Sequence, residues 1–157
     1  MRAAAGDDVD ALSRLWHEAD ELHAQLSPGF FRRPEAARGR QRAAEALRDA
    51  EDNGHEVILV ASSGGAICGA CHLQIYDTPV GHSMVAQRRG HVETLIVARV
   101  QRRRGCGRAL MQAATEWARG KGASQLLLTV WAGNEEAERF YAALGYRTIS
   151  QVLGNDL

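Results

Sequence analysis

The apolar residues in the first third of the chain follow the spacing of helices. The first run places its apolar residues three or four positions apart, and so on one face, namely Val9, Leu12, Trp16, Ala19, Leu22 and Leu26. Asp7 or Asp8 can cap this helix at its start, and Ser27-Pro28-Gly29 ends it. We expect a second helix from about Pro34, with Asn53-Gly54 as its stop signal.

After these helices the pattern changes to short apolar segments separated by glycine-rich turns, which is typical of strands. Following a short extended start at Arg2–Ala5, we expect strands over 56–61 and 66–76 that are joined by a tight turn at Gly64-Gly65. The other predicted elements are strands over 91–97, 125–131 and 146–153, and helices over 105–119 and from Asn134 to Gly145. Because 125–131 is almost entirely apolar, we expect both its faces to be covered. The elements predict an α/β fold with helices on both sides of a mixed sheet.

Composition narrows the classes of protein that this chain can be. Its 157 residues, 45% hydrophobic and 24% charged, suit one globular domain over residues 1–157. Lys+Arg and Asp+Glu number 19 each, and this balance argues against a general nucleic-acid or anionic-membrane binder. The net charge is −4 over residues 1–60 and +4 over 61–157, which suggests two differently charged ligand surfaces.

The cysteines and the chain start bear on compartment and metal binding. No apolar run approaches the ~20 residues that span a bilayer, and the first residues turn acidic where a secretory signal is apolar, so we expect a cytoplasmic protein with reduced cysteines. Cys68-Gly-Ala-Cys71-His72 spells a haem-attachment pattern, but it lies inside a predicted strand. No second cysteine pair completes a zinc site, so we expect packed small residues and no metal.

The segment 93–111, ETLIVARVQRRRGCGRALM, gives the clearest indication of ligand chemistry. A strand ends there, and Gly105 and Gly107 stand at the start of a helix. Glycines permit close approach of a ligand, and a helix start offers unpaired N–H groups with partial positive charge, which together suit a pyrophosphate. Charge-assisted contacts to phosphates are available to Arg102, Arg103, Arg104 and Arg108. The alternative is an ordinary solvated arginine turn before a helix.

These residues resemble the signatures of a known family. Arg102-x-x-Gly105-x-Gly107 is similar to the acyl-CoA motif of the GNAT superfamily of N-acyltransferases, Gln/Arg-x-x-Gly-x-Gly/Ala, and NEEAERFYAALGYR (134–147) is similar to its second signature. The order of elements from Met1 to Leu153 also resembles a GNAT domain. Arg103 departs from the pattern, since many members carry glycine there. The resemblance implies a GNAT-like fold, a mostly antiparallel mixed sheet flanked by about four helices, with acetyl-CoA as co-substrate.

The resemblance also implies roles for particular residues. Acyl transfer to an amine needs a base, a donor for the developing oxyanion and an acid for the leaving thiolate. By resemblance Glu93 is the candidate base, directly or through water, and Tyr141 the candidate acid. The backbone N–H of Val97, at a splayed strand end, is the candidate oxyanion donor. His91, two residues from Glu93 on the same strand face, is a second candidate base. The structural alternatives are an ion-paired Glu93 and a packed Tyr141.

The cofactor is expected to lie across the same segment. The resemblance places its phosphates on residues 102–109 and its pantetheine arm between 93–97 and 126–131. The expected contacts are Leu95, Ile96, Val97, Arg102, Arg103, Arg104, Gly105, Cys106, Gly107, Arg108, Ala109, Asn134 and Tyr141. Asn134 and Tyr141 are seven residues apart, about two helical turns, and so project from one face, although Asn134 is equally explained as a helix cap. Direct transfer needs no acyl-cysteine, so we expect Cys106 to be a loop residue.

The acceptor is the least determined part of the prediction. It is either a small-molecule amine or a protein amino group, in a site shaped by residues 16–33 and 76–90. Two sets of residues could either contribute to the acceptor pocket or have a purely structural role. They are the acidic residues Glu18, Asp20 and Glu21, and the aromatic residues Trp16, Phe30, Phe31 and Tyr76. The remaining histidines have no supporting spacing and are expected to be structural: His17, His23, His55, His72 and His82.

Taken together, the sequence predicts an N-acetyltransferase that transfers an acetyl group from acetyl-CoA to a primary amine by direct attack in a ternary complex. The alternative is an acyl-CoA-binding regulatory or partner-binding module without catalysis. Neither nucleic acid nor a membrane is an expected partner. Members of the family often form homodimers, but nothing in this sequence specifies an interface.

Overall fold

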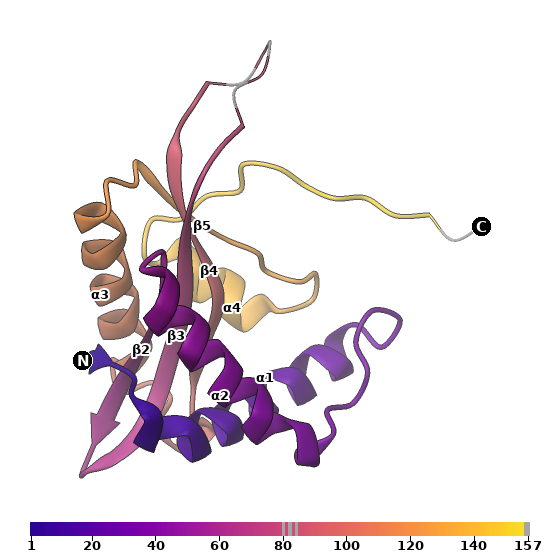
Figure 1. Ribbon diagram of the computed structural model, residues 1–157. Coiled ribbons are helices and arrows are strands. Elements are labelled where there is room, and N and C mark those ends of the chain that lie inside the picture. Colours follow the sequence, from indigo (N-terminus) through magenta and orange to yellow (C-terminus); the bar gives the residue numbers. More distant parts are fainter. Residues whose placement is uncertain (80, 82, 84, 156–157) are drawn as a thin grey trace.

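The computed structural model describes residues 1–79, 81, 83 and 85–155 (Figure 1). In chain order its elements are β1 (Arg2–Ala3), η1 (Gly6–Asp8), α1 (Val9–Leu26), α2 (Ala36–Asn53), β2 (Glu56–Ser63), β3 (Ala66–Asp77), β4 (Arg88–Val97), η2 (Arg99–Gln101), α3 (Cys106–Gly120), β5 (Gln125–Leu128) and α4 (Glu135–Ala142). The predicted helices are all present, with bounds within two residues of those expected at most ends.

The strands form one mixed sheet in the order β1-β2-β3-β4-β5. The first four strands pair antiparallel, and β5 pairs parallel to β4. The turn between β2 and β3 has Gly64 at φ +60° and Gly65 at φ +82°, the left-handed conformation that a tight hairpin requires at both positions. The predicted mixed, mostly antiparallel sheet is therefore confirmed.

Helices cover both faces of this sheet, as the sequence predicts (Figure 1). Because successive strand residues point to opposite faces, Ile58 and Val60 pack with α1 and α2, whereas Leu59 and Ala61 pack with α3. The α1–α2 layer buries Leu12, Trp16 and other apolar residues of the periodic face. The sheet thus lies between two apolar layers, one with α1 and α2 and one with α3.

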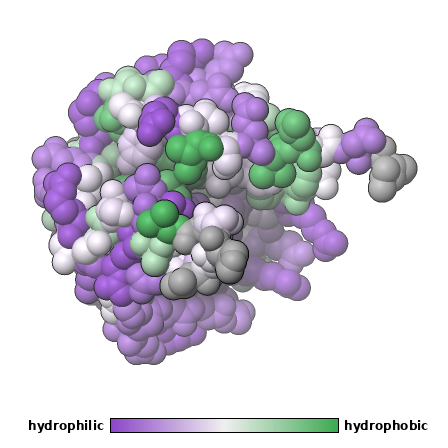
Figure 2. All heavy atoms as spheres, turned by 90° about the horizontal axis from the view of Figure 1, so that it is seen from above, coloured by the Kyte–Doolittle hydropathy of each residue, from purple (hydrophilic) through white to green (hydrophobic). Residues whose placement is uncertain are grey.

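Three predicted strands differ in the structure, and the first of them, expected over 91–97, already begins at Arg88. The predicted strand 125–131 ends at Leu128, because its register with β4 stops at the Val92–Leu128 pair. The predicted strand 146–153 is wrong: residues 146–155 form no strand, and Figure 1 shows this segment projecting away from the sheet. Its residues Val152 and Leu153 are 99% and 89% exposed, and Figure 2 shows apolar side chains beside the grey chain end.

The start of the chain is held by a partly buried ion pair. Asp8 precedes α1 but makes no side-chain cap bond to it. Its carboxylate instead accepts two hydrogen bonds from Arg2, at 2.6 and 2.9 Å, and one from the Ala5 N–H at 2.9 Å. The Arg2 hydrogen bond, aided by its charge and the Ala5 N–H, lowers the pKa of Asp8 despite burial. Within the described residues, no helix is long and apolar enough to cross a membrane.

Candidate active site

A β-bulge in β4 sets the position of Glu93. The β3–β4 register pairs His72 with Thr94 and Leu73 with Val92, so Glu93 has no register partner. The extra residue reverses the alternation of faces along β4: Val92 packs in the α3 layer and Ile96 in the α1–α2 layer. Glu93 and its neighbour Thr94 consequently line the same cavity on the α1–α2 side.

Beyond this bulge, β4 and β5 separate. Their last register pair is Val92–Leu128, and a cavity of about 390 Å³ lies where the two strands part. One wall of the cavity is formed by residues 91–96 and the other by 128–131. The predicted splay between these segments is therefore present in the structure, and it accounts for the early end of β5.

The splay leaves backbone donors of β4 facing the gap. The Ala98 N–H donates to the Cys68 carbonyl at 2.9 Å, so Ala98 is directed toward β3. Because N–H groups alternate in direction along an antiparallel strand, those of Leu95 and Val97 point to the opposite side, where the register with β5 has ended. Val97 is thus one of two residues whose N–H points away from β3, and its role as oxyanion donor stays a prediction.

Glu93 lies in a polar chain with two neighbours. Gln74 Nε2 donates to Glu93 Oε1 at 2.5 Å, and His91 Nδ1 lies 2.9 Å from the same oxygen. Burial alone favours the neutral acid, but the hydrogen bonds from Gln74 and His91 outweigh it and lower the pKa of Glu93. An ionised carboxylate only accepts hydrogen bonds, so Nδ1 of His91 is the donor in this pair.

Tyr141 and Asn134 meet the cavity from the other side. Both residues line it, as expected from their spacing of about two helical turns on α4. The Asn134 side chain also accepts from the Ala137 N–H at 3.2 Å, so its predicted capping role is confirmed. Burial, together with nearby Cys71 and Tyr146, raises the pKa of Tyr141 well above its ordinary value. The phenol is therefore protonated at physiological pH.

The glycine-arginine turn joins the end of β4 to α3. Gly105, at φ +83°, precedes the helix, and Arg103 is a non-glycine residue with a left-handed backbone, at φ +62°. This φ explains why glycine suits position 103 in the resembling motif. Arg102 Nε donates to the Val97 carbonyl at 3.2 Å, and its Nη1 lies 3.3 Å from Glu136. Arg102 therefore holds the splayed strand end in place, besides any contact with a phosphate.

Gly107 has a packing reason that the sequence did not reveal. A Cβ at this position would lie 3.2 Å from Cζ of Phe140 and 3.6 Å from Cγ2 of Val97. The glycine thus permits close contact between α3, α4 and β4. The neighbouring Cys106 Sγ is 3.6 Å from that of Cys68, and burial, with Cys68 beside it, raises the pKa of Cys106 to about 12. Cys106 is therefore a poor nucleophile, but the expectation that it is a loop residue is wrong, because it is the first residue of α3.

The start of α3 fits a phosphate-bearing cofactor. The helix has no side-chain cap and no acidic residue in its first turn, so its first N–H groups and its partial positive charge remain available. Arg104 and Arg108 are exposed beside it. These are the features that bind anions at helix starts. The residues present therefore fit the diphosphate of a CoA molecule.

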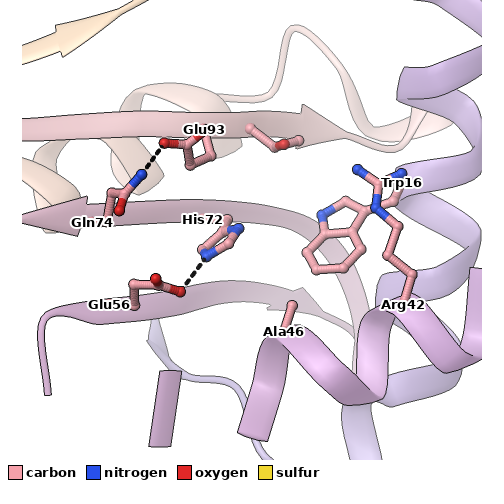
Figure 3. A pocket seen from close by; sticks show the side chains of 8 residues that line it. Trp16, Arg42, Ala46, Glu56, His72, Gln74 and Glu93 are labelled. Atoms are coloured by element: carbon pink, nitrogen blue, oxygen red, sulfur yellow. Dashed lines mark hydrogen bonds and ion pairs between the residues drawn. The ribbon is translucent and has the colours of Figure 1, made fainter. Parts of the chain in front are cut away.

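A second, adjoining cavity of about 330 Å³ lies between α1, α2 and the strands β2–β4 (Figure 3). It is lined by Trp16, Arg42, Ala46, Glu56, His72, Gln74, Glu93 and Thr94. Of the predicted acceptor-site residues, Trp16, Asp20 and Phe31 line one or both cavities. Phe31 packs edge-on against Trp131, with ring centroids 4.7 Å apart, and both residues line the 390 Å³ cavity.

The other predicted acceptor-site residues lie elsewhere. Glu18 accepts from the Arg99 N–H at 3.2 Å, and Glu21 pairs with His17 at 3.4 Å. Phe30 is 79% exposed, and Tyr76 lies outside both cavity linings. His82 lies outside the described residues.

Comparison with known proteins supports the same family as the motifs. A sequence model of the acetyltransferase (GNAT) family matches residues 16–146. The chain belongs to the GNAT family. YhfO of Bacillus subtilis (strain 168), an uncharacterized N-acetyltransferase, is 30% identical over 148 residues, or 93% of this chain and 88% of YhfO. YobR of the same organism, also an uncharacterized N-acetyltransferase, is 31% identical over 82 residues, which cover 50% of this chain and only 33% of YobR.

Solved structures share the GNAT fold of this chain. A mutant form of the BH1408 protein from Bacillus halodurans has a TM-score of 0.90 at 23% identity, with 99% of this chain and 98% of that chain covered. AAC(6')-Iy, solved in complex with the bisubstrate analog CoA-S-monomethyl-acetylneamine, has a TM-score of 0.71 at 20% identity, with 99% and 95% covered. At these identities the likeness establishes the fold.

Some residues of this GNAT site were not foreseen from the sequence. Gln74 holds the Glu93 carboxylate, and His72 pairs with Glu56 at 3.3 Å in the second cavity. His72 had been expected to be structural. The alternation of β3 gave a usable signal, because His72 and Gln74 are polar residues two apart in an otherwise apolar strand and so share a face.

Proposed function

We propose that this GNAT protein transfers an acetyl group from acetyl-CoA to a primary amine by direct attack in a ternary complex. The observation that supports this most is the cavity between the parted strands β4 and β5. Glu93 and His91 line it from one side and Tyr141 from the other. A base and an acid are thus available at a gap that leads to an uncapped helix start.

The donor side is formed by the parted strands and the turn after β4. When bound, acetyl-CoA supplies the acetyl group as an activated thioester. The first N–H groups of α3, with Arg103, Arg104 and Arg108, would hold its phosphates. Leu95 and Ile96 of the β4 wall, together with Asn134, would contact its pantetheine arm. The Val97 N–H is directed to the gap and would stabilise charge that develops on the thioester oxygen, a contribution of about 10²–10³ in rate.

The acceptor side needs a group that takes a proton from the amine. Since the pKa of Glu93 is lowered, its carboxylate is a weak base but a suitable anion for attracting an ammonium group. Its contact with His91 Nδ1 orients the imidazole and leaves Nε2 able to accept the proton. We therefore assign Glu93 and His91 to one unit, in which the carboxylate orients and the imidazole accepts.

Tyr141 supplies the proton for the departing thiolate. Burial keeps its phenol protonated, and its ring is held by edge-on contacts with Phe140 and Tyr146, at centroid distances of 5.1 and 5.7 Å. Because the ring is fixed by packing, Tyr141→Phe removes the hydroxyl with little change in shape. We expect turnover to fall about 10²-fold while acetyl-CoA affinity is retained.

The test combines binding and turnover on the purified protein. Calorimetry measures acetyl-CoA affinity, and release of free CoA is followed with a panel of primary amines. Tyr146→Phe is the matched control for Tyr141→Phe, since it removes a hydroxyl from the same aromatic cluster outside the cavity lining. Tyr141→Phe with full turnover would refute the acid role. Binding of acetyl-CoA without transfer to any amine would refute the proposed reaction and favour a non-catalytic binding module.

The helix start is tested separately by reversing charge. Arg108→Glu places an acid in the first turn of α3, where it should repel phosphates and weaken acetyl-CoA binding at least tenfold. Arg119→Glu makes the same charge change in the last turn of the same helix and should leave affinity nearly unchanged. Equal affinities for the two variants would show that the cofactor does not bind at the start of α3.

A further inference from the structure

The second cavity is continuous with the candidate active site. Trp16, Arg42, Glu93 and Thr94 line both cavities, so Glu93 stands between them. Figure 3 shows the second cavity bordered by side chains from three adjacent strands and from both helices of the α1–α2 layer. A molecule whose amine lies near Glu93 in the first cavity can therefore extend along the sheet into the second.

The charge of the second cavity is negative. Glu56 on β2 and Glu93 on β4 are two strands apart, roughly 10 Å at the usual strand spacing. The cation at the cavity, Arg42, is already engaged: its Nη1 lies 2.5 Å from Asp20, and its guanidinium covers the Trp16 ring at 5.4 Å. The cavity thus offers two carboxylates, each hydrogen-bonded to one imidazole, as acceptors for a ligand.

Trp16 adds a donor to this acidic surface. The residue is only 4% exposed, and among the described residues its Nε1 has no hydrogen-bond partner. A buried N–H that is left unpaired destabilises the fold, so most such groups have an acceptor. Figure 3 shows the indole nitrogen on the edge of the ring that faces the strands, and His72 stacks against the same ring at 6.0 Å. The donor is therefore directed at the cavity.

The combination of donor and carboxylates selects among ligand groups. An ammonium group would bind the carboxylates but give the indole N–H no acceptor. A carboxylate would accept from the indole but be repelled by Glu56 and Glu93. An apolar group would leave the indole N–H without an acceptor. A hydroxyl group satisfies both sides, because its oxygen accepts from Trp16 while its hydrogen is donated to a carboxylate.

We infer that the second cavity binds a hydroxyl group of the acceptor, so that the preferred substrates are hydroxylated amines such as amino alcohols and amino sugars. This inference rests on the proposed acetyl transfer and specifies its substrate class. Trp16 and Glu56 are then the residues that determine specificity, at the end of the site away from the thioester. Neither is required for the transfer step itself.

The experiment compares amines that differ by one hydroxyl group. Acetylation by the purified protein is measured with 1,3-diamino-2-propanol and, separately, with 1,3-diaminopropane. The ratio of the two kcat/KM values gives the preference for the hydroxylated amine. In Trp16→Phe, which keeps the ring but removes the N–H, we expect this preference to fall about tenfold relative to the wild type. The difference in basicity between the two amines cancels in this comparison. Glu56→Gln should lower the preference as well, whereas Trp117→Phe, an indole removed from α3, should not change it.

The outcomes separate the inference from the proposed function. If both diamines are acetylated and Trp16→Phe and Glu56→Gln leave the preference unchanged, the inference is overturned while acetyl transfer stands. If neither diamine is acetylated, calorimetry of the two diamines with the CoA-saturated protein still tests the cavity, and the proposed function fails only if no primary amine of the panel is acetylated. In this calorimetry, tighter binding of the hydroxylated amine that is lost in Trp16→Phe supports the inference. Equal binding of both amines overturns it.

Discussion

Replacing Arg103 by glycine should make the protein more stable. Arg103 has φ +62°, a conformation that costs a side chain with a Cβ about 1–2 kcal/mol and glycine almost nothing. Glycine also raises the entropy of the unfolded chain, which offsets about 0.4–1 kcal/mol of this gain. The lost contact with Glu136 is long, 3.7 Å, and the Arg103 side chain is 83% exposed, so it contributes little. We expect a net gain of about 0.5–1 kcal/mol, or about 1–4 °C in Tm.

Arg104→Gly is the matched control, because it removes the next arginine from the same turn. Among the described residues the positive φ of a non-glycine residue occurs at Arg103, so glycine at 104 gains no relief from strain and should lower Tm. Differential scanning calorimetry and urea unfolding measure both variants. If the two glycines lower Tm alike, the strain argument is wrong. Acetyl-CoA affinity gives a second readout, since Arg103→Gly should weaken binding several-fold if its guanidinium contacts a phosphate.

Three further predictions concern the fold around the site. Asp8→Asn should lower the urea midpoint of unfolding at pH 7. Because Arg2 lowers the pKa of Asp8, the charge of Asp8 stabilises the fold above about pH 4, and this contribution disappears as the pH falls through the pKa of Asp8 in the folded protein. The urea midpoints of the wild type and the variant should therefore converge in acid. Gly69→Ala should cost about 1–3 kcal/mol in urea unfolding, because the new Cβ would lie 2.9 Å from the Ile96 carbonyl oxygen. Because its pKa is raised to about 12, Cys106 should react with iodoacetamide about 1,000-fold more slowly than a free cysteine at pH 8. Rapid alkylation would contradict the burial argument. Cys106→Ala should retain turnover.

The sequence predicted those parts of the fold that depend on local patterns. The helical period of residues 9–26 identified the face that packs on the sheet, and the glycine pair at 64–65 identified the hairpin. Helical spacing likewise predicted that Asn134 and Tyr141 face one cavity. In each case the signal lies within one element, where side-chain direction follows from residue number alone.

Features that depend on partners were missed. Residues 146–153 are rich in β-branched residues and predict a strand, but a strand needs a neighbour to pair with, and this segment leaves the sheet. The bulge at Glu93 was equally hidden, since the sequence 91–97 looks like an uninterrupted strand until its register with β3 is known. The close approach of Phe140 to Gly107 joins two helices that are far apart in sequence. From the motif alone, the glycine was therefore explained by the approach of a ligand and not by helix packing.

Two irregularities of β4 create the candidate site, and each depends on the other. The bulge turns both Glu93 and Thr94 toward the α1–α2 layer, which places an acid beside His91 on the acceptor side. The separation from β5 begins at the next residues, because pairing ends at Val92. A regular β4 would keep Glu93 in register and its later N–H groups paired to β5, which would close the gap and remove the donors together. The N–H groups of Leu95 and Val97 point away from β3 to the side where the register with β5 has ended, so a ligand in the gap can accept hydrogen bonds from them.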